Sequence, residues 1–222
     1  MTNSEASAVV RPGVYPSNPQ RPVHAFVPTS AKRVLDVGCN TGAFGGALKC
    51  ARSVEVWGIE PNPQAAESAR SVLDRVIVAP LSSDASIPDG HFDVITFTDV
   101  LEHFADPWDA LRVCLPKLRP GGCVVASIPN VLFIENLLHM LFERDFRYED
   151  LGIRDRTHLR FFTRRSAVRL FEESGYEVER AEGIDEAWWT PSMRRRLAFR
   201  LFGSTYLAET KYIHYVLVAR PR

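Results

Sequence analysis

The sequence predicts a doubly wound α/β fold, and three observations support this prediction. Short β-branched apolar runs alternate with segments of helical period from residue 33 onward. A glycine-rich turn follows the first of these runs. The 222 residues, of which 45% are hydrophobic, suffice for one full-sized core. Strands that alternate with helices indicate a mostly parallel sheet with helices on both faces.

The elements follow one another in a regular order after a flexible N-terminal lead-in, residues 1–30, which is rich in Pro, Ser and Asn. Strands are expected at 33–38, 54–60, 75–81, 92–98, 122–130, 176–184 and 211–220. Helices are expected at 43–51, 63–73, 107–118 and 164–174. Residues 31–222 then form a single domain with one seven-stranded sheet.

Two segments break this rhythm and are expected to form insertions on the substrate side, residues 130–162 and 185–210. The first is a lid between the fifth strand and the next helix. Its apolar part, residues 131–142, is expected to be buried as a lid or a subunit contact. In the helix at 107–118, Asp106 should cap the start before Pro107, and Pro116 should kink or shorten the end.

Charge and hydropathy exclude several classes of partner. Lys plus Arg and Asp plus Glu both total 27, so no net field attracts nucleic acid, and none is expected as a partner. The first twenty residues lack the features of a secretory signal, and no apolar run is long enough to span a bilayer. A cytoplasmic monomer or homodimer is expected. The basic and apolar stretch 193–203 leaves contact with a membrane surface as a minor alternative.

The glycine-rich turn, VLDVGCNTGAFG at residues 34–45, indicates a ligand site at the carboxyl edge of the sheet. Asn40 occupies the place where a dinucleotide-binding turn has the glycine that admits a pyrophosphate. Asp36 would repel a pyrophosphate but suits an ammonium or sulfonium group. Glu60 ends the next strand, where an acid accepts hydrogen bonds from ribose hydroxyls. A cationic nucleoside ligand therefore fits better than NAD.

Four stretches together resemble the successive motifs of class I S-adenosylmethionine-dependent methyltransferases. They are VLDVGCNTGAFG, GIEPN, SSDASIPDGHFDVITFTDVLEH and LPKLRPGGCVVASIPN. The resemblance covers about residues 15–184 and agrees in order and spacing. It implies a Rossmann-like, seven-stranded sheet, mostly parallel with an antiparallel last strand. It also implies S-adenosylmethionine as cofactor and S-adenosylhomocysteine as product.

The resemblance further implies which residues bind the cofactor. Its methionine end would lie at Asp36, Gly38, Asn40 and Gly42, its ribose at Glu60 with Pro61, and its adenine at Asp84 and Ala85. Thr98 and Asp99 would border the amino acid end, while Tyr15 and Arg21 resemble a lead-in that folds over the cofactor. The sequence departs from the family at Asn40, which replaces the commoner glycine, and at Pro116, which interrupts a helix.

Catalytic candidates follow from the chemistry of methyl transfer, an in-line displacement that needs a base only when the acceptor must lose a proton. His103 follows the fourth strand, and His158 lies in the first insertion, with Asp155 available to orient its ring. Either histidine could instead have only a packing or loop-ordering role. Asp99, Glu102 and His103 could together face a divalent metal, but three ligands from one turn rarely converge, so no metal is expected.

The acceptor is inferred from the segment DRTHLRFFTRRSAVRLFEESGYEV, which resembles bacterial methyltransferases of surface glycan and lipopolysaccharide biosynthesis. This favours O-methylation of a sugar hydroxyl in a glycan or glycan precursor. Aromatic and basic side chains of the insertions could bind it: Phe146, Tyr148, Trp188, Trp189, Arg147, Arg154 and Arg160. Two alternatives stay open. One is a small aromatic or quinone-type acceptor, and the other is a cofactor-binding protein without turnover.

Overall fold

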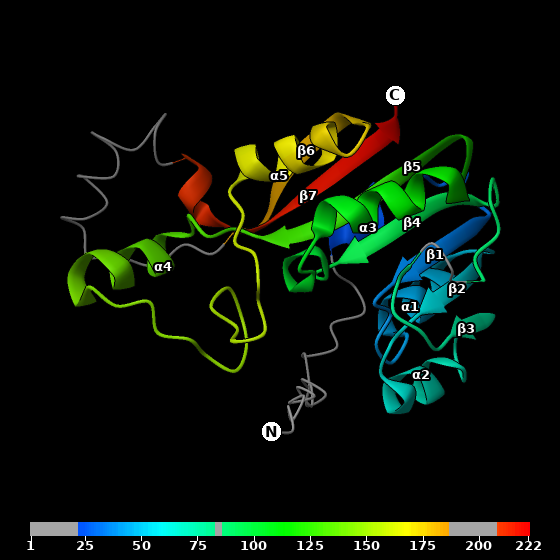
Figure 1. The fold of residues 1–222 in the computed structure, drawn as a ribbon, viewed down its shortest axis with the longest axis horizontal. Helices are drawn as coiled ribbons and strands as arrows, with labels where there is room; N and C mark the ends of the chain where they lie inside the picture. The colour runs from blue at the N-terminus through cyan, green and yellow to red at the C-terminus, as the bar shows by residue number, and fades with distance from the viewer. Residues whose placement is uncertain (1–21, 83–85, 187–207) are drawn as a thin grey trace, which may run out of the picture.

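A seven-stranded sheet forms the centre of the molecule (Figure 1). The computed structural model describes residues 22–82, 86–186 and 208–222. The strands are β1 (Arg33–Val37), β2 (Glu55–Ile59), β3 (Arg75–Ile77), β4 (Phe92–Thr98), β5 (Leu118–Pro129), β6 (Tyr176–Glu186) and β7 (Tyr212–Pro221). They lie in the order β3-β2-β1-β4-β5-β7-β6.

The strand directions bring several strand ends together at one edge of the sheet. Strands β1 to β5 pair in parallel, whereas β7 runs antiparallel to both β5 and β6. The predicted mostly parallel sheet with an antiparallel last strand is therefore confirmed. The carboxyl ends of β1, β2, β4 and β5 meet at one edge, and the start of β7 joins them because His214 pairs with Pro129. Ligands of open α/β sheets bind at this edge.

Helices cover both faces of the sheet (Figure 1). They are α1 (Ala43–Ala51), α2 (Pro63–Ala69), α3 (Pro107–Cys114), α4 (Ile134–Leu138) and α5 (Arg164–Glu173). Short helical turns are η1 (Pro22–Phe26), η2 (Leu101–His103), η3 (Leu115–Lys117), η4 (His139–Glu143) and η5 (Ala208–Lys211). Neighbouring strand residues face opposite sides, so Leu35 packs with α3 and α5, whereas Val34 packs with α1 and η1. This alternation gives the fold two apolar layers.

The ends of α3 agree with the sequence. The Asp106 carboxylate accepts a hydrogen bond from the Asp109 amide at 2.9 Å, and Pro107 occupies the first turn. The helix ends at Cys114, and Pro116 lies in the short turn η3 that follows. Because proline lacks an amide hydrogen and clashes with the preceding turn, it shortens the helix as expected.

The apolar segment 131–142 differs from its prediction. Phe133 and Asn136 are buried, but Leu141 and Phe142 are 69% and 75% exposed. Helix α4 and the turn η4 extend beyond the end of β5, away from the sheet (Figure 1). Burial therefore holds only for the part of the segment next to β5. Most of the second predicted insertion, residues 187–207, lies outside the described residues. Among the described helices, none has the length and apolar character needed to cross a membrane.

Candidate functional site

The turn between β1 and α1 adopts the left-handed backbone conformation three times. Gly38, Asn40 and Gly42 have φ angles of 66°, 48° and 80°. A Cβ atom on Gly38 would lie 2.8 Å from Val100, and one on Gly42 would lie 2.7 Å from Val72. Glycine is therefore required at both positions for conformation and for space. Asparagine is among the few other residues that tolerate this conformation, which explains how Asn40 replaces the commoner glycine.

Asp36 places a buried carboxyl group directly before this turn. Its Oδ1 accepts a hydrogen bond from the Thr96 hydroxyl at 2.8 Å, while its buried Oδ2 has no hydrogen-bond partner among the described residues. Burial raises the pKa of Asp36 to about 7, and the charge of Glu60 adds to this rise. A buried acid with an unused acceptor oxygen fits a positively charged ligand, which would favour its ionised form.

Glu60 links the turn to the start of α2. Its Oε2 accepts a hydrogen bond from the Asn40 amide, and its Oε1 accepts one from the Asn62 amide, both at 2.9 Å. Each carboxylate oxygen has a second lone pair, so these bonds leave acceptor capacity for a diol. Pro61, between the two bonded segments, is exposed at this edge. Glu60 therefore connects these two segments and still offers acceptors to a ligand. Asp36, the turn from Gly38 to Gly42 and Glu60 together are called the cradle below.

The end of β4 contributes Thr98 and Asp99 to the same edge. Asp99 has a φ of 53°, and its Oδ1 accepts a hydrogen bond from the Ser127 hydroxyl at 2.7 Å. The buried hydroxyl of Thr98 has no hydrogen-bond partner among the described residues. Four further residues predicted to bind the cofactor lie outside the described residues, namely Tyr15, Arg21, Asp84 and Ala85.

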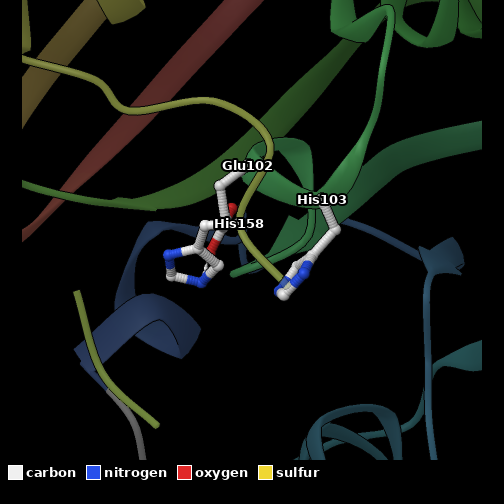
Figure 2. Close-up of side chains that lie close together, drawn as sticks. All are labelled: Glu102, His103 and His158. Carbon is white, nitrogen blue, oxygen red and sulfur yellow. Dashed lines mark ion pairs between the residues drawn. The ribbon is translucent and has the colours of Figure 1, made fainter. Parts of the chain in front are cut away.

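A compact group of acid and imidazole side chains lies beside this edge. Glu102 and His103 come from η2, and His158 comes from the segment between β5 and α5 (Figure 2). One potential ligand atom from each residue lies within 4.8 Å of the other two. The backbone carbonyl of Glu102 accepts the amides of Leu159 and Arg160 at 2.9 and 3.0 Å, which fixes this segment against η2. The sequence suggested Asp99 as the third member, whereas the structure brings in His158.

Hydrogen bonds to backbone carbonyls define the tautomer of both imidazoles. His103 Nδ1 lies 3.2 Å from the Thr157 carbonyl oxygen, and His158 Nδ1 lies 3.1 Å from that of Ile153. A carbonyl oxygen can only accept, so Nδ1 carries the hydrogen and Nε2 keeps a lone pair. Burial lowers the pKa of both histidines, which favours the neutral form of both rings. Two neutral imidazoles and a buried carboxyl form a suitable donor set for a divalent cation.

Asp155 supports this group through Thr157. Its Oδ1 accepts hydrogen bonds from the Thr157 amide and hydroxyl at 2.8 and 2.7 Å. Burial raises the pKa of Asp155, but these bonds outweigh that effect and lower it. The Thr157 hydroxyl also lies 3.1 Å from His103 Nδ1. Asp155 thus supports the segment that carries His103's partner, whereas the hydrogen bond that orients His158 goes to Ile153. Thr157 was not anticipated from the sequence.

The aromatic and basic candidates for acceptor binding divide into separate groups. The rings of Phe146 and Tyr148 pack against each other and against Phe161, which was not anticipated. Phe161 also lies 6.2 Å from the ring of His158, so this aromatic group borders the acid and imidazole cluster. Arg154 is buried and paired with Glu149.

The other basic candidates divide between solvent and the backbone. The Arg147 side chain is exposed, and the Arg160 guanidinium donates to the backbone carbonyl of Ala105. Trp188 and Trp189 lie outside the described residues.

Comparison with known proteins places the chain in a family. The family described as a methyltransferase domain matches residues 15–181. The ubiquinone biosynthesis O-methyltransferase of Thiobacillus denitrificans is 30% identical over 170 residues, which cover 73% of this chain and 72% of that protein. The protein of the same name from Neisseria meningitidis serogroup A is 24% identical over 198 residues, covering 86% and 77% of the two chains.

Solved structures share the fold at low sequence identity. A methyltransferase from Archaeoglobus fulgidus is 18% identical, has a TM-score of 0.64 and covers 86% of each chain. One from Mesorhizobium loti is 18% identical, has a TM-score of 0.60 and covers 89% of this chain and 95% of its own. The family match and the cradle around Asp36 agree. The chain therefore belongs to the methyltransferase-domain family and is an S-adenosylmethionine-dependent methyltransferase.

Proposed function

We propose that this methyltransferase transfers a methyl group to a phenolic hydroxyl of a small aromatic, quinone-type acceptor. The two relatives described above are named for ubiquinone biosynthesis and for O-methyl transfer. They favour the quinone-type alternative over the glycan acceptor suggested by the segment around His158. The acid and imidazole cluster is compatible with this alternative, because a phenol must lose its proton and a bound cation would assist that loss.

The cofactor-binding part of this proposal rests on the cradle. Asp36, Gly38, Asn40 and Gly42 would hold the methionine end, Glu60 and Pro61 would bind the ribose, and Thr98 and Asp99 would border the amino acid end. Asp84, Ala85, Tyr15 and Arg21 remain part of the proposal as adenine and lead-in contacts. When bound, S-adenosylmethionine supplies an electrophilic methyl group on a sulfonium. The chain must hold the acceptor hydroxyl in line with that methyl and exclude competing water.

The observation that carries the proposal is the convergence of Glu102, His103 and His158 within 4.8 Å. We assign these three residues to a divalent cation, in place of the earlier expectation of no metal. A cation there would lower the pKa of a hydroxyl that binds it. Two imidazole nitrogens and one carboxylate suit a transition-metal ion better than Mg²⁺ alone, which prefers oxygen ligands. Asp155 would act at a distance by ordering Thr157 beside His103.

Methyl transfer to defined acceptors tests this function. The protein is incubated with methyl-labelled S-adenosylmethionine and either 3,4-dihydroxybenzoate, a catechol, or a nucleotide sugar. We expect label in the catechol, at least a tenfold loss of rate with EDTA, and recovery when Mn²⁺ or Zn²⁺ is added. Label in the sugar alone would support the hypothesis of a glycan acceptor instead. Binding of the cofactor without label in any acceptor would favour the non-catalytic alternative.

A matched pair of variants separates the cluster from general effects. Glu102→Gln removes a charged donor from the cluster and should lower the rate at least tenfold while the Kd for S-adenosylmethionine stays unchanged. Glu67→Gln is the control, because Glu67 is exposed on α2 and pairs only with Arg70 among the contacts described. An unchanged rate for Glu102→Gln, together with full activity in EDTA, would refute the cation site.

A further inference from the structure

A second acid and imidazole pair lies at the same edge of the sheet, on the two strands that close the fold. His214 of β7 is paired in register with Pro129 of β5 and with Ile184 of β6. Its neighbours in the edge are Asp99 at the end of β4 and Asp185 near the end of β6. Charged or imidazole side chains from β4, β7 and β6 therefore form a row across this part of the edge.

Both nitrogens of His214 face carboxylates. Nδ1 lies 2.9 Å from Asp185 Oδ2, which is hydrogen-bond distance, and Nε2 lies 3.9 Å from Asp99 Oδ1, which is longer than a hydrogen bond. Asp99 is held in turn by the Ser127 hydroxyl of β5 at 2.7 Å. Asp99 and Asp185 both have left-handed backbones, with φ angles of 53° and 54°. Side-chain-bearing residues in this conformation are uncommon and concentrate at functional sites.

The partner of Nδ1 distinguishes His214 from the other two histidines of the edge. His103 and His158 direct Nδ1 to backbone carbonyls, whereas His214 directs it to a carboxylate. A carboxylate that holds Nδ1–H leaves the Nε2 lone pair to accept a proton, and it stabilises the positive charge that the ring then gains. The side chain of His214 is 18% exposed, so the ring has access to solvent or to a ligand at the edge.

We propose that His214, oriented by Asp185, is the general base that removes the proton from the acceptor hydroxyl. This inference rests on the proposed function, because only a hydroxyl acceptor must lose a proton. The proton passes from the acceptor oxygen to Nε2 of His214 and then to solvent. That oxygen forms the bond to the methyl carbon as the methyl–sulfur bond breaks, and the sulfur retains the electron pair. His103 and His158 keep their proposed role as ligands of the cation. Asp185 is a positioning residue, because it acts on the acceptor only through His214.

The test compares His214→Ala with His214→Asn, because asparagine still donates a hydrogen bond to Asp185 but cannot take up the proton. Turnover of 3,4-dihydroxybenzoate and the Kd for S-adenosylmethionine are measured for each. Both variants should lower kcat by about 10² to 10⁴-fold, the range for general acid–base catalysis. The Kd for the cofactor should change less than threefold. Added imidazole should restore part of the activity of His214→Ala only, because that variant leaves space for the ring.

Two further variants complete the design. Asp185→Asn should lower kcat about tenfold or more without raising KM in proportion, as expected of a residue that orients a base. His91→Ala is the control, because His91 precedes β4 at the opposite edge of the sheet and should leave kcat unchanged.

Each outcome decides between the two proposals. If the wild-type protein methylates the catechol and His214→Asn retains its kcat, the general-base role falls and the proposed function stands. A rise in KM alone would mean that His214 only binds the acceptor, which also overturns the inference. If the wild-type protein transfers no methyl group to the catechol, the proposed function is wrong, and this inference is wrong as well because it depends on that function.

Discussion

Asp36 is a residue whose environment disfavours its own charge in the ligand-free protein. Burial raises its pKa to about 7, from an ordinary value near 3.8. Between about pH 4 and 7 the folded state therefore binds more protons than the unfolded state, so stability falls as the pH rises through this window. At about 1.4 kcal/mol per unit of pKa, the loss above pH 7 is roughly 3 to 5 kcal/mol. A cationic ligand beside the carboxylate would offset this cost.

Asp36→Asn should remove this pH dependence. The amide cannot ionise, so the ligand-free variant should be more stable than the wild type above pH 7 and should lose affinity for S-adenosylmethionine. Urea unfolding at pH 5.5 and pH 8, with cofactor titration by calorimetry, measures both effects. Asp109→Asn, an exposed change on α3, is the control. A variant that binds the cofactor as tightly as the wild type would contradict the assignment of Asp36 to the charged end of the cofactor.

The β1–α1 element concentrates the backbone requirements of the cradle in one turn. Gly42 precedes α1 with a φ of 80°, and an added Cβ would lie 2.7 Å from Val72. Gly46 lies inside the same helix, where an added Cβ would meet Val72 at an ordinary 3.4 Å. Position 42 therefore requires glycine, whereas position 46 can accept a side chain, although the two are close in sequence.

Alanine substitutions at these two glycines should change stability in opposite directions. Gly42→Ala should lower the free energy of unfolding by about 1 to 3 kcal/mol, because it adds both strain and a clash. Gly46→Ala should raise it by about 0.5 to 1 kcal/mol, because alanine favours the helix. Thermal unfolding of the two variants measures the difference. Equal destabilisation by both changes would show that space in α1, rather than the backbone of the turn, limits this element.

Elements with strong local signals were predictable from sequence. The start of α3 at Asp106 and its early end before Pro116 follow from the chemistry of single residues. The exposure of Leu141 and Phe142 did not follow, because an apolar segment is expected to be buried unless its distance from the core is known. Strand β3 is also shorter than its apolar run, and among the described residues it lies at the edge of the sheet, next to β2.

At the scale of the whole molecule, the site depends on strand order and on contacts between distant segments. The proposed cofactor motif could be identified from the sequence because Asp36, Gly38 and Gly42 are close together in it. His158 meets Glu102 only after the segment beyond β5 folds back on η2. His214 reaches Asp99 only because β7 inserts between β5 and β6. A histidine inside an apolar strand pattern carries no local sign of such a partner, so sequence alone did not identify it.

Cofactor binding should stabilise the entire fold, because the residues proposed to bind it lie on segments that follow β1, β2 and β4. At a concentration of 100 times its Kd, a ligand adds about 2.7 kcal/mol of stability. For a domain of this size, that corresponds to a rise in Tm of roughly 5 to 10 °C. At pH 8, where Asp36 is mostly ionised, S-adenosylmethionine should produce this shift, whereas NAD at the same concentration should not, since the Asp36 carboxylate would repel its pyrophosphate.

Glu60→Ala should abolish most of this shift, because it removes the acceptor assigned to the ribose. The variant also loses the hydrogen bonds from Asn40 and Asn62, so its ligand-free Tm should fall. The informative quantity is therefore the rise in Tm on adding cofactor, measured for each variant against its own ligand-free Tm, with Glu67→Ala as the control. A full cofactor shift in Glu60→Ala would mean that Glu60 only braces the turn. A shift with NAD and none with S-adenosylmethionine would contradict the assignment of the cradle to S-adenosylmethionine. The charge of Asp36 and the side chain of Asn40 would then not exclude a pyrophosphate.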